Sequence, residues 1–111
     1  SADFDDALNQ EAVSATTILT TNRAEVRIGP DRAMTISFDV VKQTIFSNGK
    51  RIESQEGQVR YAIPAGTTES FTTYNRRTLA PIGDRPKALF LRDFNSLFLE
   101  AAKDAGLWSA A

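Results

Sequence analysis

An Asn-Gly pair at positions 48 and 49 lies between two long stretches of alternating apolar and polar residues, and it constrains the fold more than any other feature. Asn-Gly is the preferred loop of a two-residue type I′ hairpin, because both residues of that loop must adopt positive φ. The pair therefore predicts an antiparallel hairpin that joins strands near residues 33–47 and 50–63.

The two-residue loop also determines which residues of the two strands lie opposite each other. Next to the loop, Ser47 faces Lys50. Farther along, three apolar pairs fall on one face: Phe38 with Val59, Ile36 with Tyr61, and Met34 with Ile63. A slip of one residue would destroy this agreement, and the agreement therefore supports the register.

The alternation fails near the middle of the same hairpin. Val40 and Val41 are consecutive apolar residues, and Gly57, a residue type that weakens strands, lies opposite Val40. We therefore expect a β-bulge or a sharp twist near residues 40–42 and 56–57. The hairpin is then long and bent.

Further strands are expected on both sides of this hairpin. Residues 14–21 are rich in β-branched side chains and residues 24–28 alternate in polarity, with a turn at Asn22–Arg23 between them. Residues 68–79 predict another strand, and a loop containing Pro and Gly follows over residues 80–85.

A long helix is expected near the C-terminus, over residues 84–106. Asp84 is a candidate N-cap, and Pro86 is tolerated in the first turn. Gly106 is the expected C′ residue, at which the chain leaves the helix in the left-handed conformation. An apolar stripe at helical spacing is available to cover the sheet: Phe90, Phe94, Leu97, Phe98, Ala101 and Ala105.

Further large apolar residues near this helix lie outside the stripe. The ones that most need another cover are Leu91, Leu99 and Trp108. A small monomer rarely leaves so large an apolar patch in water, so we expect them to form the interface of an obligate oligomer, with a two-fold dimer as its simplest form. The alternative is that residues 3–12, through Phe4 and Leu8, fold back over these positions within one chain.

Negative charge is concentrated at the N-terminus. Asp3, Asp5, Asp6 and Glu11 lie in the first eleven residues with no basic residue among them. The rest of the chain carries all 13 Lys and Arg and 10 of the 14 Asp and Glu. A short helix capped by Asp3 is expected here. The segment is either the solvated start of that helix or an arm that docks on the basic surface of a neighbouring copy.

The composition argues against catalysis. The chain has no His and no Cys, so the usual general base, a thiol nucleophile and the commonest zinc ligands are missing. No phosphate-binding loop or nucleophile motif is present. The alternation places Asp39 on a solvent face rather than in a site, and the spacing of Glu25, Glu53, Glu56 and Glu69 does not match a calcium loop. We expect no enzyme, no cofactor and no metal.

Basic residues form a second candidate surface. The formal net charge of −1 is too balanced for bulk electrostatic binding of nucleic acid by a monomer, but weak contacts add up in an assembly. The residues that can meet a phosphate backbone or stack on a base are Lys50, Arg51, Arg60, Tyr74 and Arg76. The alternative is an ordinary solvated sheet face.

A strand meander followed by a C-terminal helix, in a chain of 111 residues, resembles the coat proteins of small single-stranded RNA phages. That resemblance implies a helix that interlocks dimers and an inward sheet face that meets RNA. The order of elements also resembles that of small bacterial envelope lipoproteins. Both are likenesses of fold, and a fold does not fix a function.

The sequence thus predicts one α+β domain over residues 1–111. It comprises an acidic arm or short helix over 1–12, a β-meander over 13–79 that forms an antiparallel sheet of about four to six strands, and a C-terminal helix over 84–106 packed on one face.

The expected function is that of a non-catalytic, self-associating structural or assembly subunit, such as a virion coat or a similar particle component. The alternative is a periplasmic or envelope adaptor that binds a partner protein or a lipid-like ligand. No apolar run approaches the roughly 18–20 residues that span a bilayer. Localisation stays open between a virion and the periplasm or envelope.

Overall fold

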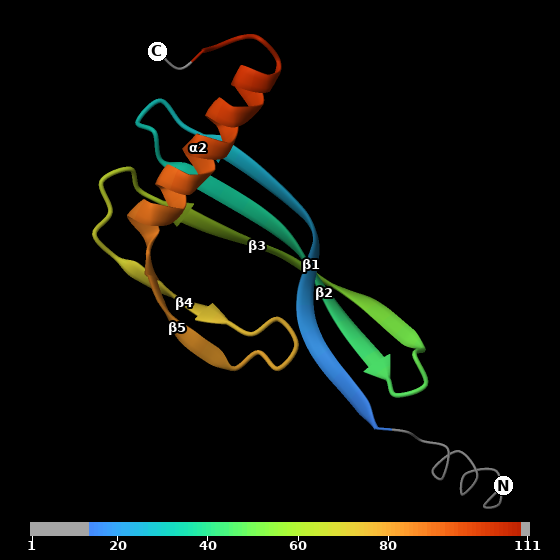
Figure 1. Cartoon of the computed structure of the whole chain (residues 1–111). Coiled ribbons are helices and arrows are strands. Elements are labelled where there is room, and N and C mark those ends of the chain that lie inside the picture. The colour runs from blue at the N-terminus through green and yellow to red at the C-terminus, as the bar shows by residue number, and fades with distance from the viewer. Residues whose placement is uncertain (1–13, 110–111) are drawn as a thin grey trace, which may run out of the picture. The chain divides into compact units, whose positions relative to one another are not determined.

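The computed structural model describes residues 14–109, which form five strands and one helix (Figure 1). In chain order they are β1 (Ala15–Ile28), β2 (Met34–Phe46), β3 (Arg51–Ile63), β4 (Ser70–Tyr74), β5 (Pro81–Pro86) and α2 (Lys87–Asp104). The strands form two antiparallel sheets, one in the order β1-β2-β3 and the other made of β4 and β5. The predicted α+β class is therefore confirmed. The short helix predicted over residues 3–12 lies outside the described residues.

The chain divides into two compact units. Within the described residues, unit 1 contains 14–26, Ile36–Tyr61 and Arg76–Thr78, and unit 2 contains Arg27–Thr35, Ala62–Asn75 and 79–109. The three long strands contribute residues to both units, whereas β4, β5 and α2 lie wholly in unit 2.

The hairpin of β2 and β3 is confirmed, but its loop has three residues rather than two. The Phe46 N–H donates to the Lys50 carbonyl at 2.8 Å, and the Gly49 N–H donates to the Phe46 carbonyl at 2.9 Å. Phe46, and not Ser47, therefore faces Lys50. Gly49 has a φ of +90°, and the Asn48 side-chain oxygen accepts the Lys50 N–H at 2.9 Å. Only one residue of the loop needs positive φ, as in a type I turn followed by a bulge.

A bulge lies on β3 where the sequence predicts an irregularity. The Gln43 amide donates to the Glu53 carboxylate at 2.7 Å, and the Gln58 amide donates to the Asp39 carboxylate at 3.1 Å. Asp39 and Gln43 are four positions apart, whereas Glu53 and Gln58 are five apart, so β3 has one extra residue in this interval. Gly57 lies there with a φ of +126°.

β1 also contains a bulge, but it remains one strand through residues 22 and 23. The predicted turn at Asn22–Arg23 is therefore wrong. At one end of the β1–β2 pair the Gly29 N–H donates to the Ala33 carbonyl, and at the other the Ser47 N–H donates to the Ser14 carbonyl. Ser14 to Gly29 is fifteen positions and Ala33 to Ser47 is fourteen, so β1 also has one extra residue.

The hydroxyl of Thr21 contacts the backbone of both β1 and β2. It lies 2.7 Å from the carbonyl oxygen of Asp39 and 2.9 Å from that of Arg23. Asp39, through its carbonyl to β1 and its carboxylate to β3, thus contacts both neighbours of β2.

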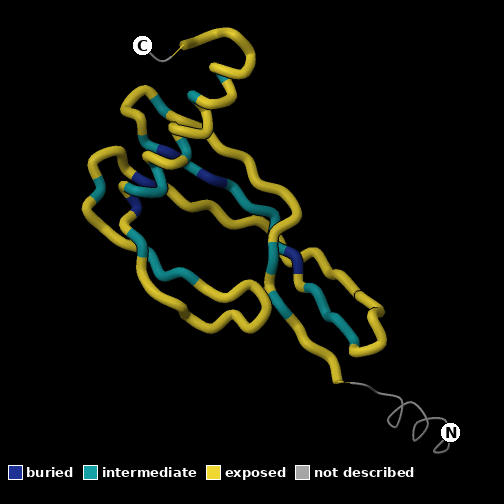
Figure 2. The backbone as a smooth tube through the Cα atoms, in the orientation of Figure 1, coloured by how far each residue is buried: buried dark blue, intermediate teal, exposed yellow. Residues whose placement is uncertain are grey.

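The buried core of the described residues is small and lies mainly on β2. Met34, Ile36 and Val41 are buried there, as is Ile63 at the end of β3; these residues fall in the dark blue stretches of Figure 2. Ile36 and Val41 are five positions apart, so in an unbroken strand they point to opposite sides. β2 therefore buries one face near its start and the other face near its middle.

The apolar face predicted for the hairpin is only partly covered. Met34, Ile36 and Ile63 are buried, but Val59 and Tyr61 are exposed. The side chains nearest the turn that joins β1 and β2 are thus the buried ones.

The segment before the helix differs from the prediction. A loop is expected over residues 80–85 and the helix from residue 84, but residues 81–86 form β5 and the helix begins at Lys87. Asp84 of β5 lies opposite Thr72 of β4. The Asp84 carboxylate accepts a hydrogen bond from the Thr72 hydroxyl at 3.2 Å, so it does not cap the helix. Pro86 is the N-cap and provides no side-chain hydrogen bond.

Three contacts attach the start of α2 to the segment around β4. The Lys87 N–H donates to the Glu69 carbonyl at 2.9 Å, and the Lys87 ammonium donates to the Glu69 carboxylate at 3.1 Å. The Phe71 and Phe90 rings pack edge to face, with centroids 6.2 Å apart. Lys87 is the one charged residue found buried among the described residues, and this pairing offsets the cost of its burial.

The C-terminal end of α2 has the geometry that the sequence predicts. Gly106 has a φ of +75°, its N–H donates to the Lys103 carbonyl, and the Leu107 N–H donates to the Ala102 carbonyl. This pair of hydrogen bonds is a Schellman motif with Gly106 at C′.

Replacing Gly49 with Ala is expected to lower the free energy of unfolding by about 1 kcal/mol, because Ala at positive φ is strained. Gly66→Ala is the matched control. A Cβ at either position meets no atom within 4 Å, but only Gly49 has positive φ. Gly66→Ala should be neutral or slightly stabilising. Urea unfolding at one fixed protein concentration measures both; equal effects would contradict the loop geometry.

Candidate functional site

Unit 2 contains an apolar groove with a volume of about 610 Å³, which we call the helix groove. One wall is formed by Leu91, Phe94 and Phe98 of α2, and the other by Ile28 and Met34 at the ends of β1 and β2. Ile28 and Phe98 keep 51% and 59% of their surface exposed. The groove is therefore an open apolar surface rather than a filled core.

Two arginines, Arg32 and Arg92, also line the helix groove. Arg32 lies in the turn between β1 and β2, where its N–H donates to the Gly29 carbonyl at 2.9 Å. Its φ is +67°, a left-handed conformation that costs a residue with a side chain about 1 kcal/mol or more. Within residues 14–109 its guanidinium has no ion-pair partner.

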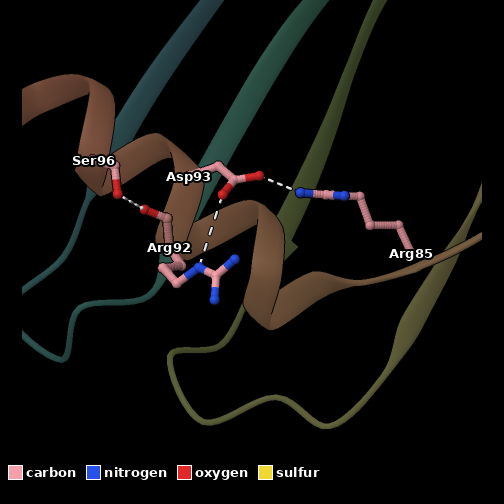
Figure 3. Close-up of polar contacts among 4 residues, drawn as sticks. All are labelled: Arg85, Arg92, Asp93 and Ser96. Carbon is pink, nitrogen blue, oxygen red and sulfur yellow. Dashed lines mark hydrogen bonds and ion pairs between the residues drawn. The ribbon is translucent and has the colours of Figure 1, made fainter.

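Arg92 is only partly neutralised. Its Nε lies 3.9 Å from a carboxylate oxygen of Asp93, while the other oxygen of Asp93 is bound by Arg85 (Figure 3). The Arg92 carbonyl accepts a hydrogen bond from the Ser96 hydroxyl at 2.9 Å, within the helix. The single carboxylate of Asp93 thus pairs with the guanidinium groups of both Arg85 and Arg92, which leaves a net positive charge beside the groove.

The structure leaves the second half of α2 and the residues that follow it largely uncovered. Leu97, Phe98, Leu107 and Trp108 have 70%, 59%, 82% and 42% of their surface exposed, and we call them the apolar end of α2. The prediction that Leu97 and Phe98 cover the sheet is therefore wrong. The contacts that fix the helix, those of Lys87, Phe90 and Asp93, lie in its first two turns.

The three residues predicted for an oligomer interface differ in exposure. Trp108 belongs to the apolar end of α2, Leu91 is half-buried in the wall of the helix groove, and Leu99 is half-buried. Sequence reasoning thus identified Trp108 as part of this surface, but it assigned Leu97 and Phe98 to the face that covers the sheet.

Unit 1 contains a second, more polar pocket of about 460 Å³, which we call the arginine pocket. Arg51 of β3 lines it together with Arg76 and Arg77 of the turn between β4 and β5. Glu53 also lines it, but its carboxylate accepts the hydrogen bond from Gln43. The guanidinium groups of Arg51 and Arg76 have no ion-pair partner within residues 14–109, which makes this pocket a favourable place for an anion.

Sequence reasoning predicts five residues for nucleic-acid contact, and the structure brings two of them, Arg51 and Arg76, into this pocket. Lys50 and Arg60 are exposed but are not among its lining residues, and Tyr74 lies in unit 2. Arg77 was missed, although it follows Arg76 directly and its charge was the available signal.

The described carboxylates form no site of another kind. Residues 14–109 contain no group of three or more Asp, Glu, His or Cys placed to hold a metal ion. Asp39 is hydrogen-bonded to Gln58, and Glu69 to Lys87. In the same part of the chain, α2 is not apolar enough to be a membrane-spanning helix.

Comparisons with models of known protein families, with curated proteins and with solved structures found no match to this chain.

Replacing Arg32 with Gly is expected to raise the free energy of unfolding by about 0.5–1 kcal/mol, because Gly adopts positive φ without strain. Lys50→Gly is the control, since Lys50 also lies beside a hairpin turn but has no positive φ. That control should lower stability through the greater entropy of the unfolded chain. Urea unfolding compares the two; a loss of stability in Arg32→Gly would show that the Arg32 side chain supports the fold.

Proposed function

We propose that this chain is a non-catalytic structural subunit that associates with copies of itself, and that the assembly is a protein shell such as a virion coat. The observation that carries the proposal is the apolar end of α2. Its four large side chains are exposed in a chain whose described residues bury only four hydrophobic residues. Exposed apolar patches of this kind mark protein–protein interfaces.

The energetics of this surface favour association. Burying one Leu or Phe side chain contributes about 1.5–3 kcal/mol. The four residues of the apolar end of α2 can together offset much of the roughly 4–15 kcal/mol that association costs. An isologous contact around a two-fold axis uses the same patch from both copies, and therefore doubles the buried apolar surface.

Unit 1 offers apolar surface of its own. Leu19 on β1 and Ile52 and Val59 on β3 have 53–56% of their surface exposed. Apolar surface in both units suits a subunit with several neighbours better than a protein with one partner.

A second activity, contact with nucleic acid inside the assembly, is favoured by the arginine pocket. Arg51, Arg76 and Arg77 line one pocket in unit 1, and guanidinium groups bind phosphate strongly. The chain as a whole is nearly neutral, so a single copy binds weakly, and the assembly supplies the affinity through many copies.

The competing proposal is an envelope adaptor, and it is favoured by the helix groove. A volume of about 610 Å³ falls in the range of small-molecule sites, and its walls are apolar enough for a lipid-like ligand. This function needs no self-association, so the oligomeric state separates the two proposals.

Replacing both Leu97 and Phe98 with Glu is expected to dissociate the assembly, because each copy then brings two charges into the contact. Ser96→Glu is the matched control, since Ser96 is an exposed residue on the polar face of the same helix. Analytical ultracentrifugation at micromolar concentration should show a discrete oligomer for the wild type and the control, and a monomer for the double variant. Leu91→Glu tests the interface predicted from the sequence in the same way.

A wild type that sediments as a monomer would overturn the assembly proposal and bring the adaptor forward. An oligomer that survives both glutamates at positions 97 and 98 would show that association uses another surface.

Replacing Arg51 and Arg76 with Gln is expected to weaken binding of a single-stranded RNA oligonucleotide to the assembled protein. Each lost phosphate contact should make the dependence of log affinity on log salt shallower by about 0.7. Lys103→Gln is the control, because Lys103 is a cation of α2 that pairs with Glu100. Filter binding at several salt concentrations measures the slopes; equal slopes for both variants would contradict a role of the arginine pocket.

A further inference from the structure

We propose that the acidic N-terminal segment of one copy, residues 3–12, docks in the helix groove of a second copy. This inference rests on the proposed self-association and identifies one of its contacts. It joins two features: an apolar groove lined by Arg32, which is unpaired in the described residues, and Arg92, which is partly neutralised, and a segment of the same chain that is both acidic and apolar.

The groove requires an occupant that combines apolar side chains with negative charge. Its walls expose Ile28 and Phe98, and Arg32 among its lining residues has no ion-pair partner within the described part of the chain. The acidic groups around it are already engaged. The Asp31 carboxylate accepts the Ala33 N–H at 3.1 Å, and the Asp93 carboxylate is shared between Arg85 and Arg92.

The N-terminal segment has the matching composition. Phe4 and Leu8 are four positions apart, so a helical turn brings them onto one face. Asp3, Asp5 and Asp6 surround them, and the first basic residue of the chain is Arg23. No other stretch of comparable length carries four acidic residues without a basic one.

The assignment to a second copy follows from the proposed self-association. Leu8 is six positions from Ser14, a distance that even a fully extended chain limits to about 20 Å. Copies that associate can exchange a short identical segment at little cost, so that each groove receives the segment of a neighbour.

Cysteine cross-linking tests this contact directly, because the chain has no Cys and introduced thiols are the only ones present. Two full-length variants, Leu8→Cys carrying an affinity tag and untagged Phe98→Cys, are mixed and oxidised. A tagged heterodimer on a non-reducing gel is the expected product. The matched control replaces Phe98→Cys with Val59→Cys, because Val59 is about as exposed, at 55% against 59%, but lies in unit 1. The Phe98 pair should cross-link at least fivefold more.

Charge exchange provides a second measurement that does not depend on thiols. Asp5→Lys with Asp6→Lys is expected to weaken association several-fold, and adding Arg32→Asp should restore part of the loss. Arg32→Gly should also weaken association, even though it relieves the strained turn. A variant that folds more stably but associates less tightly separates docking from folding. Sedimentation equilibrium measures each dissociation constant.

The outcomes distinguish this inference from the proposed function. Equal cross-linking of the Phe98 and Val59 pairs, in a wild type that sediments as an oligomer, overturns the docking and leaves self-association intact. A doubly substituted Leu8→Cys, Phe98→Cys chain that closes only an internal disulfide overturns the assignment to a second copy. A monomeric wild type with no cross-link overturns both proposals.

Discussion

β2 is the strand on which the rest of the structure depends, because it is hydrogen-bonded to a neighbour along both edges. The contacts of Asp39 show how the neighbours adjust to it: its carbonyl receives the Thr21 hydroxyl of β1, and its carboxylate receives the Gln58 amide of β3. The extra residues lie on those neighbours, so the alternation along β2 is not interrupted. Ile36 and Val41 can therefore be buried on opposite sides of one continuous strand.

Local signals in the sequence predicted the elements that depend on local chemistry. Gly106 ends the helix as expected, and the chain around Asn48 and Gly49 reverses as expected, because both rest on positive φ. The predictions of secondary structure are wrong where pairing with a distant segment determines the conformation. Residues 81–86 form a strand because they pair with β4. β1 continues through Asn22 because it is hydrogen-bonded to β2. The sequence of one segment alone reveals neither pairing.

The candidate surfaces were predictable only in part, for the same reason. Charge and hydrophobicity identified Arg51, Arg76 and Trp108, but which faces stay open depends on where the helix is attached. The contacts of Lys87, Phe90 and Asp93 fix only the first two turns of α2. Phe98 lies beyond them and stays exposed, although its spacing marks it as a core residue. Arg32 carries no signal in the sequence beyond its place after Gly-Pro-Asp, and its role depends on the groove beside it.

The bulges on β1 and β3 also affect how copies of this chain can meet. These two strands form the outer edges of the three-stranded sheet, where a row of free N–H and C=O groups invites further strands and open-ended fibre growth. An extra residue breaks the spacing of that row and twists the edge, which makes it a poor template. Pairing of further strands with these two edges is thereby discouraged.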